Sequence, residues 1–241
     1  MNNKLIIALD VETKREARAS FAALREMAGM FKIGSQLFTA AGPEIVREIV
    51  GAGGRVFLDL KFHDIPNTVA AASREAVRLG VSIFNIHAFG GGEMMRRALD
   101  AANETAHHEG IERPRVIAVT VLTSADAATL AEIGVRAAPE AQATMLARLA
   151  AQCGLDGVVA SPHEIKPVRE AVPQRDFLIV TPGVRPALSA HDDQKRVMTP
   201  GEAIRLGADY LVVGRAIINA PDPLRAAHEI GEEMARADAG R

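Results

Sequence analysis

The chain has 241 residues, 48% of them hydrophobic, and a formal net charge of −2. This length allows one α/β barrel with a sizeable core, and the near-neutral charge gives no electrostatic footprint for nucleic acid or an anionic membrane. The single cysteine, Cys153, excludes an internal disulfide and a cysteine-based zinc site. The apolar run near the N-terminus is too short for a signal peptide or a membrane span, so we expect a cytoplasmic protein.

Short apolar runs alternate with longer amphipathic segments along the whole chain. In residues 14–27 and 68–79, apolar residues recur at spacings of three and four, which is typical of helices packed on a sheet. The short runs are mostly apolar throughout, as expected for parallel strands covered on both faces. They predict eight strands, at residues 5–9, 30–33, 55–59, 82–86, 115–119, 157–160, 177–180 and 210–213.

Eight strand–helix units in a chain of this length predict a single-domain TIM (β/α)8 barrel, with an open doubly wound sheet as the alternative. No linker or low-complexity tract interrupts the pattern, so residues 1–241 are expected to form one domain. The longest stretch without a pattern is 182–198. Long loops in compact domains are often functional, so we expect this one to close over a site, the alternative being a plain surface excursion.

Charged residues stand at the ends of the first three predicted strands. Active sites of TIM barrels lie at the C-terminal ends of the strands, where Asp10, Lys32, Asp59 and Lys61 could meet. Residues two apart on a strand point to the same side, which pairs Asp59 with Lys61. Alternating charges suit a reaction in which negative charge develops on carbon and is then protonated. The charge pattern alone fits a structural ion-pair network equally well.

The last two strands are followed by residues suited to bind phosphate. Gly214 and Arg215 come directly after the eighth predicted strand, and Arg185 follows the seventh. Barrel phosphate sites form from these loops, and arginine binds phosphate in a bidentate fashion. The alternative is that Arg215 caps carbonyl groups at the barrel rim. No spacing among the seven histidines resembles a metal cluster, so no metal is expected.

The segment 59–68, Asp-Leu-Lys-Phe-His-Asp-Ile-Pro-Asn-Thr, resembles the bacterial type of the orotidine 5′-monophosphate decarboxylase family. An Asp-x-Lys-x-x-Asp pattern alone is shared with a wider suprafamily. Further family-like blocks occur in family order over essentially the whole chain. They are Ala-Leu-Asp at 8–10, Phe-Lys-Ile-Gly at 31–34, Val-Thr-Val-Leu-Thr-Ser at 119–124, Thr-Pro-Gly-Val-Arg-Pro at 181–186 and Val-Val-Gly-Arg at 212–215.

The resemblance implies a cofactor-free enzyme that converts orotidine 5′-monophosphate to uridine 5′-monophosphate and CO2, the last step of de novo pyrimidine biosynthesis. It implies a homodimer with shared active sites. Lys61 would donate a proton to C6 of the pyrimidine. Lys32, Asp59 and Lys61 would form an alternating array that Asp64 of the partner subunit completes, with Asp64 expected at the start of the next helix.

The resemblance also implies how the substrate is held. Asp10 and Lys32 would bind the ribose with the partner subunit's Thr68, and Thr123 would contact the pyrimidine. The phosphate would be bound by Arg185, Gln194, Gly214 and Arg215, with Gln194 on the closing loop also reaching toward the base. The sequence shows no departure from the family pattern at these positions.

Two other functions stay open. One is a Mg2+-dependent sugar-phosphate decarboxylase or aldolase of the same suprafamily, against which the continuation Ile65-Pro66-Asn67-Thr68 argues. The other is a non-catalytic barrel that binds a nucleotide. The intact set of Lys32, Asp59, Lys61 and Asp64 argues against the second, because a binding protein has no use for a costly array of alternating charges.

Overall fold

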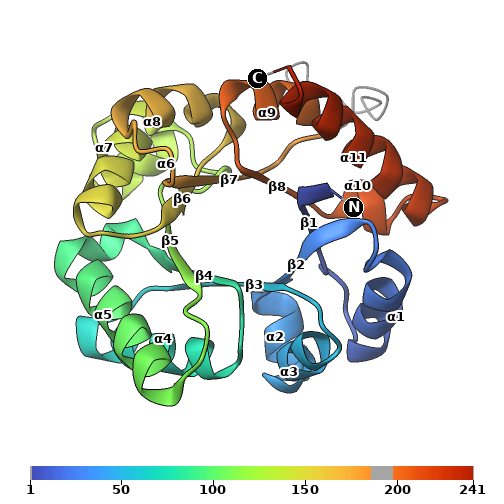
Figure 1. The fold of residues 1–241 in the computed structure, drawn as a ribbon. Coiled ribbons are helices and arrows are strands. Elements are labelled where there is room, and N and C mark those ends of the chain that lie inside the picture. Colours follow the sequence, from blue (N-terminus) through green and yellow to red (C-terminus); the bar gives the residue numbers. More distant parts are fainter. Residues whose placement is uncertain (1, 186–197, 241) are drawn as a thin grey trace.

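Eight parallel strands close into a barrel in the computed structural model, which describes residues 2–185 and 198–240 (Figure 1). The strands follow one another around the barrel in chain order, and the first pairs with the last through Leu5 and Leu211. The predicted barrel is therefore confirmed, and the open sheet is excluded. The strands are β1 (Asn2–Ala8), β2 (Ala28–Gly34), β3 (Val56–Phe62), β4 (Ile83–His87), β5 (Arg115–Val119), β6 (Gly157–Val159), β7 (Leu178–Pro182) and β8 (Tyr210–Val213).

Helices surround the barrel, as Figure 1 shows. The larger ones are α1 (Lys14–Leu24), α3 (Glu44–Gly51), α4 (Pro66–Arg78), α5 (Gly91–Glu109), α7 (Pro139–Gln152) and α11 (Pro223–Asp238). The shorter ones are α2 (Ser35–Ala41), α6 (Ala127–Glu132), α8 (Ile165–Ala171), α9 (Pro200–Leu206) and α10 (Arg215–Ile218), with single 3-10 turns η1 (Ala88–Gly90) and η2 (Pro162–Glu164).

Local sequence explains where several helices begin. Thr13 and Glu16 form a capping box at the start of α1, and Thr199 and Glu202 form another at α9. Proline occupies the first turn of α4, α7, α9 and α11, where its missing N–H costs little. The expected helix over 14–27 ends earlier, at Leu24, and the one expected from residue 68 begins at Pro66.

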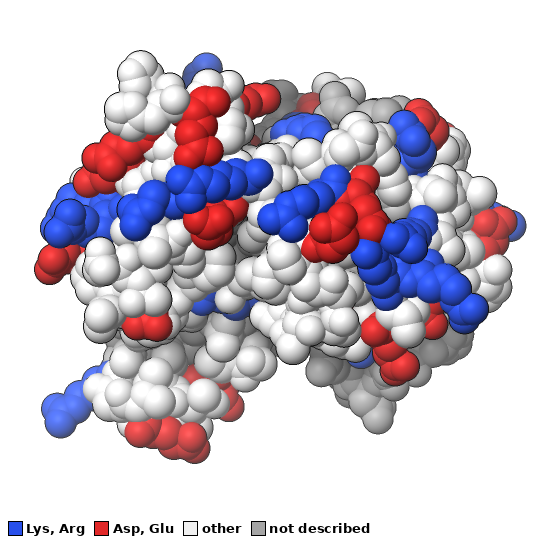
Figure 2. Space-filling view, turned by 90° about the horizontal axis from the view of Figure 1, so that it is seen from below, with Lys and Arg blue, Asp and Glu red and all other residues white. Residues whose placement is uncertain are grey.

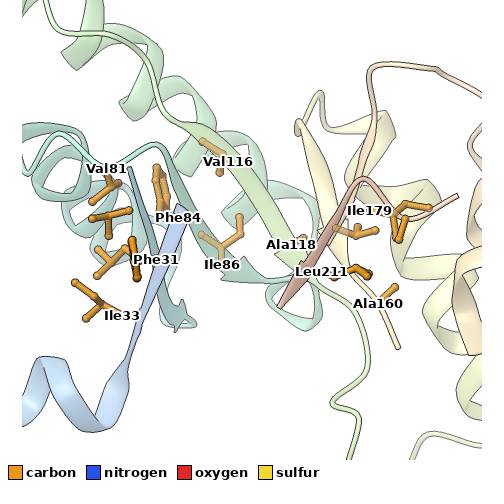
Figure 3. Close-up of a cluster of buried hydrophobic side chains, with 14 of the residues drawn as sticks. Phe31, Ile33, Val81, Phe84, Ile86, Val116, Ala118, Ala160, Ile179 and Leu211 are labelled. Carbon is orange, nitrogen blue, oxygen red and sulfur yellow. The ribbon is translucent and has the colours of Figure 1, made fainter. Parts of the chain in front are cut away.

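Alternate residues of each strand face two separate apolar clusters. Inside the barrel lie side chains such as Ile6, Phe57, Ile117 and Val212. Their neighbours in sequence point outward and pack against the helices; Figure 3 shows this outer layer. Both faces of each strand are therefore buried, which explains the continuous apolar runs in the sequence. Cys153 is buried in the outer layer.

The surface carries both charge signs. Figure 2 shows basic and acidic side chains beside one another over one face. Exposed ion pairs join neighbouring helices, such as Arg18 with Glu48 and Arg78 with Glu109. In residues 2–185 and 198–240, no helix combines the length and apolarity that crossing a membrane requires.

Candidate active site

Four charged side chains, on or just after the first three strands, meet at the C-terminal end of the barrel, as predicted. Nζ of Lys32 lies 3.0 Å from Oδ1 of Asp10 and 3.3 Å from Oδ2 of Asp59. Nζ of Lys61 lies 2.7 Å from Oδ1 of Asp59. The four form one continuous row, Asp10–Lys32–Asp59–Lys61, called the charge row below. Lys32 and Asp59 are nearly buried, with 11% and 13% of their side chains exposed.

The strand register explains how the charge row assembles. Ala8 of β1 pairs with Lys32 of β2, and Gly34 of β2 pairs with Asp59 of β3. A Cβ atom on Gly34 would lie 3.0 Å from Nζ of Lys32, so the glycine leaves room for the ammonium group. Gly34 is thus part of the arrangement that places the ammonium group of Lys32 in the charge row.

The backbone of β3 is irregular at Lys61. Leu58 pairs with Phe84 and Phe62 with Ile86, so four steps along β3 match two along β4. Such a bulge turns side chains relative to the regular strand. Lys61 has a φ of 53°, the one positive φ at a non-glycine residue in the described part of the chain. Simple alternation along a strand correctly predicted that Asp59 and Lys61 meet, whereas the bulge and the positive φ of Lys61 were not predicted.

Asn85 in β4 joins this group and was not predicted from the sequence. Its Oδ1 accepts a hydrogen bond from the backbone N–H of Lys61 at 2.8 Å, and its Nδ2 donates to Oδ1 of Asp59 at 2.7 Å. The side chain is fully buried. The signal was a single amide inside the otherwise apolar run 83–86, since a buried amide needs specific partners.

A cavity of about 980 Å3 opens beside the charge row. Asp10 and Lys32 line one part of it, and Arg185, Gly214 and Arg215 line another. A Cβ atom on Gly214 would lie 3.3 Å from Oδ2 of Asp10, so this residue keeps the backbone close to the first strand. The cavity thus connects the charge row with the two arginines predicted to bind phosphate.

The other predicted site residues are not all found beside the charge row. Thr123 lines the same cavity. Gln194 lies outside the described residues, as does most of the expected closing loop. Asp64 and Thr68 are exposed near the start of α4, and Asp64 forms no ion pair with Lys32 or Lys61 within the described residues. The fold of this chain therefore does not bring Asp64 to the charge row.

Asp64 does not begin α4, contrary to the sequence-based expectation. The helix starts at Pro66, with Ile65 at its N-cap position. The carboxylate of Asp64 instead accepts a hydrogen bond from the N–H of Ile65 at 2.6 Å. The reason is that proline suits the first helical position, which places the boundary after Asp64.

Two histidines stack beside the charge row. The rings of His63 and His87 lie 5.3 Å apart between centroids. Burial lowers the pKa of His87 to about 4, and the charges of His63 and Lys61 act in the same direction. His87 is therefore neutral at neutral pH. Among the described residues, no group of three or more His, Cys, Asp or Glu side chains could hold a metal ion.

The sequence matches the model of the orotidine 5′-phosphate decarboxylase / HUMPS family over residues 3–230. A protein of Geobacter sulfurreducens named orotidine 5′-phosphate decarboxylase is 55% identical over 231 residues, which cover 96% of this chain and 95% of that protein. One of the same name from Syntrophotalea carbinolica is 54% identical over 234 residues, 97% of this chain and 96% of that protein.

Solved structures are similar to this chain as well. A crystal structure of orotidine 5′-phosphate decarboxylase from Lactobacillus acidophilus is similar with a TM-score of 0.84 at 35% identity, covering 95% of this chain and 98% of that one. An uncharacterized conserved protein from Geobacillus kaustophilus is similar with a TM-score of 0.80 at 38% identity, covering 95% and 99% of the two chains. Fold, site and sequence thus lead to one assignment: the chain belongs to the orotidine 5′-phosphate decarboxylase / HUMPS family.

Proposed function

We propose that this protein decarboxylates orotidine 5′-monophosphate to uridine 5′-monophosphate and CO2, the last step of de novo pyrimidine biosynthesis. The observation that carries the proposal is the charge row, which adjoins a cavity lined elsewhere by Arg185 and Arg215. Relatives that are 50–55% identical to this chain bear the name of this enzyme, which favours this activity over the sugar-phosphate alternative.

The cavity suggests how the nucleotide binds. Its phosphate would lie against Arg185, Gly214 and Arg215, where guanidinium groups bind the anion in a bidentate fashion. We place Gln194 at the same group. The ribose would lie against Asp10 and Lys32, and the pyrimidine beside Thr123. The substrate carboxylate then faces Asp59.

The chemistry follows from this pose. The bond between C6 and the carboxylate carbon breaks, its electron pair stays on C6, and CO2 leaves. The ammonium of Lys61 stabilises the negative charge on C6 and then donates its proton there. Two like charges about 4 Å apart repel by roughly 4 kcal/mol at an effective dielectric of 20, so Asp59 also disfavours the bound carboxylate. These steps require no cofactor.

We further propose that the working enzyme is a homodimer. Asp64 and Thr68 are exposed near the start of α4, beside Ile65, which is 66% exposed. Burying this segment against a second subunit would remove the exposed apolar side chain from water. It would also supply the partner subunit's Asp64 and Thr68 to the charge row. Residues 1–241 would then form one catalytic domain.

The direct test follows the ultraviolet absorbance of orotidine 5′-monophosphate mixed with the protein, with and without a metal chelator. We expect conversion to uridine 5′-monophosphate at the same rate in both. Turnover of a sugar phosphate that stops with the chelator would favour the Mg2+-dependent alternative. Nucleotide binding without any change in absorbance would show a non-catalytic barrel and contradict the proposal.

A further inference from the structure

The amide of Asn85 makes two short hydrogen bonds to the segment that carries Asp59 and Lys61. Its Oδ1 accepts from the Lys61 N–H at 2.8 Å, and its Nδ2 donates to Oδ1 of Asp59 at 2.7 Å. Asn85 lies two residues after Ile83, whose side chain belongs to the cluster inside the barrel. By strand alternation Asn85 also points inward, toward the base of the charge row.

These bonds occur where the backbone is strained. A φ of 53° is uncommon for a residue with a long side chain, because Cβ crowds the carbonyl oxygen in the left-handed region. At a bulge, backbone groups lose their partners on the neighbouring strand. The side-chain oxygen Oδ1 of Asn85 takes the place of the missing partner and accepts the hydrogen bond from the Lys61 N–H. The unusual backbone of Lys61 is therefore held by a side chain from the next strand.

The same amide also fixes the carboxylate. Oδ1 of Asp59 receives one hydrogen bond from Nδ2 of Asn85 and one from Nζ of Lys61, both at 2.7 Å. The planar amide of Asn85 thus binds both the backbone N–H of Lys61 and Asp59, whose carboxylate pairs with the Lys61 ammonium group. A side chain in this place must accept a hydrogen bond from the Lys61 N–H and donate one to Asp59. Among side chains of this size, only an amide or a protonated acid has both a donor and an acceptor at its end.

We infer that Asn85 is a positioning residue for the decarboxylation: its amide holds the Lys61 backbone and the Asp59 carboxylate so that the Lys61 ammonium points at the reacting carbon. This inference rests on the proposed function. Asn85 acts through Lys61 and Asp59. A displacement of about 1 Å in a catalytic group lowers rates by about 100-fold, so loss of the amide should act on kcat more than on KM.

The first test is Asn85→Ala. We expect kcat for orotidine 5′-monophosphate to fall about 10- to 100-fold, while KM changes less than about threefold because the phosphate contacts remain. The matched control is Thr120→Val. Thr120 is also fully buried, and its hydroxyl also bonds to the neighbouring strand, at the carbonyl of Val159, but it has no bond to Asp59 or Lys61. The control should keep kcat within about twofold of the wild type.

The second test is the pH profile of Asn85→Asp. Its new carboxyl group keeps the acceptor for the Lys61 N–H, but it can donate to Asp59 only when protonated. We expect burial and the neighbouring Asp59 carboxylate to raise the pKa of this acid from about 3.9 into the assayed range, so that it becomes protonated as the pH falls. We therefore expect the ratio of variant to wild-type kcat to rise about tenfold or more as the pH falls from about 8 to about 5. For Thr120→Val the ratio should be independent of pH.

The outcomes separate the two proposals. An active wild type combined with a pH-independent Asn85→Asp ratio, or with an Asn85→Ala variant of wild-type kcat, would overturn the role of Asn85 and leave the function intact. A wild type that does not turn over orotidine 5′-monophosphate would overturn the function, and the inference with it. If Asn85→Ala does not fold, the Asn85→Asp profile decides alone.

Discussion

The ammonium of Lys61 lies 2.7 Å from Oδ1 of Asp59, a residue only two positions earlier in the same strand. The bulge in β3 lies at this contact, and the buried amide of Asn85 donates to the same carboxylate oxygen. The other carboxylate oxygen of Asp59 faces Lys32 at 3.3 Å. Asp59 thus has a cation on each side, and the more exposed of the two, Lys61, is the one able to reach a bound substrate.

Lys61→Ala should abolish decarboxylation. Removing the ammonium takes away both the charge that stabilises C6 and the proton, so kcat should fall by at least about 1000-fold. Circular dichroism should show a folded protein, since the Lys61 side chain is 37% exposed. Lys166→Ala, at an exposed position of α8, is the control and should retain full activity. Residual turnover within tenfold of the wild type would exclude Lys61 as the acid.

A mixed dimer tests the shared site. Lys61→Ala and Asp64→Ala homodimers should each be inactive. In the heterodimer, one of the two sites combines an intact Lys61 with an intact Asp64, so mixing should restore up to about half of the activity per heterodimer. Activity is measured after denaturing and refolding the two variants together. A mixture that stays inactive would refute a site built from two subunits.

Arg215→Ala should separate phosphate binding from the chemistry at C6. Losing a charge-assisted, bidentate contact should lower kcat/KM for orotidine 5′-monophosphate by about 10- to 100-fold. Unphosphorylated orotidine should be turned over as before, because it lacks the group that Arg215 binds. Arg47→Ala, exposed on α3, serves as the control and should affect neither substrate. Equal losses for both substrates would contradict the phosphate role.

His87 should make stability depend on pH. Burial lowers the pKa of His87 to about 4, below the ordinary value of 6.5, so the folded protein keeps this ring neutral. Between these two values the unfolded chain binds the extra proton and the folded chain does not, so stability is lost as the pH falls from 6.5 toward 4. Above 6.5 the ring contributes no slope.

The measurement is the midpoint of thermal unfolding between pH 7 and pH 4. His87→Gln should reduce the fall in this midpoint relative to the wild type. His228→Gln changes an exposed histidine of α11 and should leave the slope unchanged. Identical slopes for the wild type and His87→Gln would mean that the buried ring carries no such penalty.

Two glycine substitutions should have opposite effects on stability. A Cβ atom on Gly157 in β6 would lie 2.3 Å from the carbonyl oxygen of Leu178 in β7, and the strand backbone cannot yield without breaking the sheet. Gly157→Ala should lower the free energy of unfolding by about 1–3 kcal/mol. Gly51→Ala, in α3, where an added Cβ would meet no atom within 4 Å, should raise it by up to about 1 kcal/mol. Denaturant unfolding measures both, and equal effects would contradict the steric argument.

The barrel was predictable because its strands are covered on both faces. Apolar runs alone placed β5 and β8 at their observed bounds. The strand β3 was predicted too short because it continues past Asp59 to Phe62, through charged residues that local pattern treats as a strand end. The acids and lysines of the charge row stood out because charges are rare in such strands.

The rest of the site depends on relationships that sequence spacing does not carry. The contact of Asn85 with Lys61 requires the register between β3 and β4, including its bulge. The left-handed backbone of Lys61 contradicts local propensity, which disfavours it for lysine. The proposed position of Asp64, beside the charge row of another subunit, depends on a second chain. The helix boundary, in contrast, could have been placed from Pro66.

The pairing of β1 with β8 also has a consequence during synthesis. Asp10 follows β1 and Arg215 follows β8, which is made much later, and both line one cavity. Until β8 emerges, β1 remains an open edge with unpaired backbone groups, a template for wrong partners. Such long-range closure slows folding. The cavity that Asp10 and Arg215 share can therefore form only after β8 has been made and the barrel has closed.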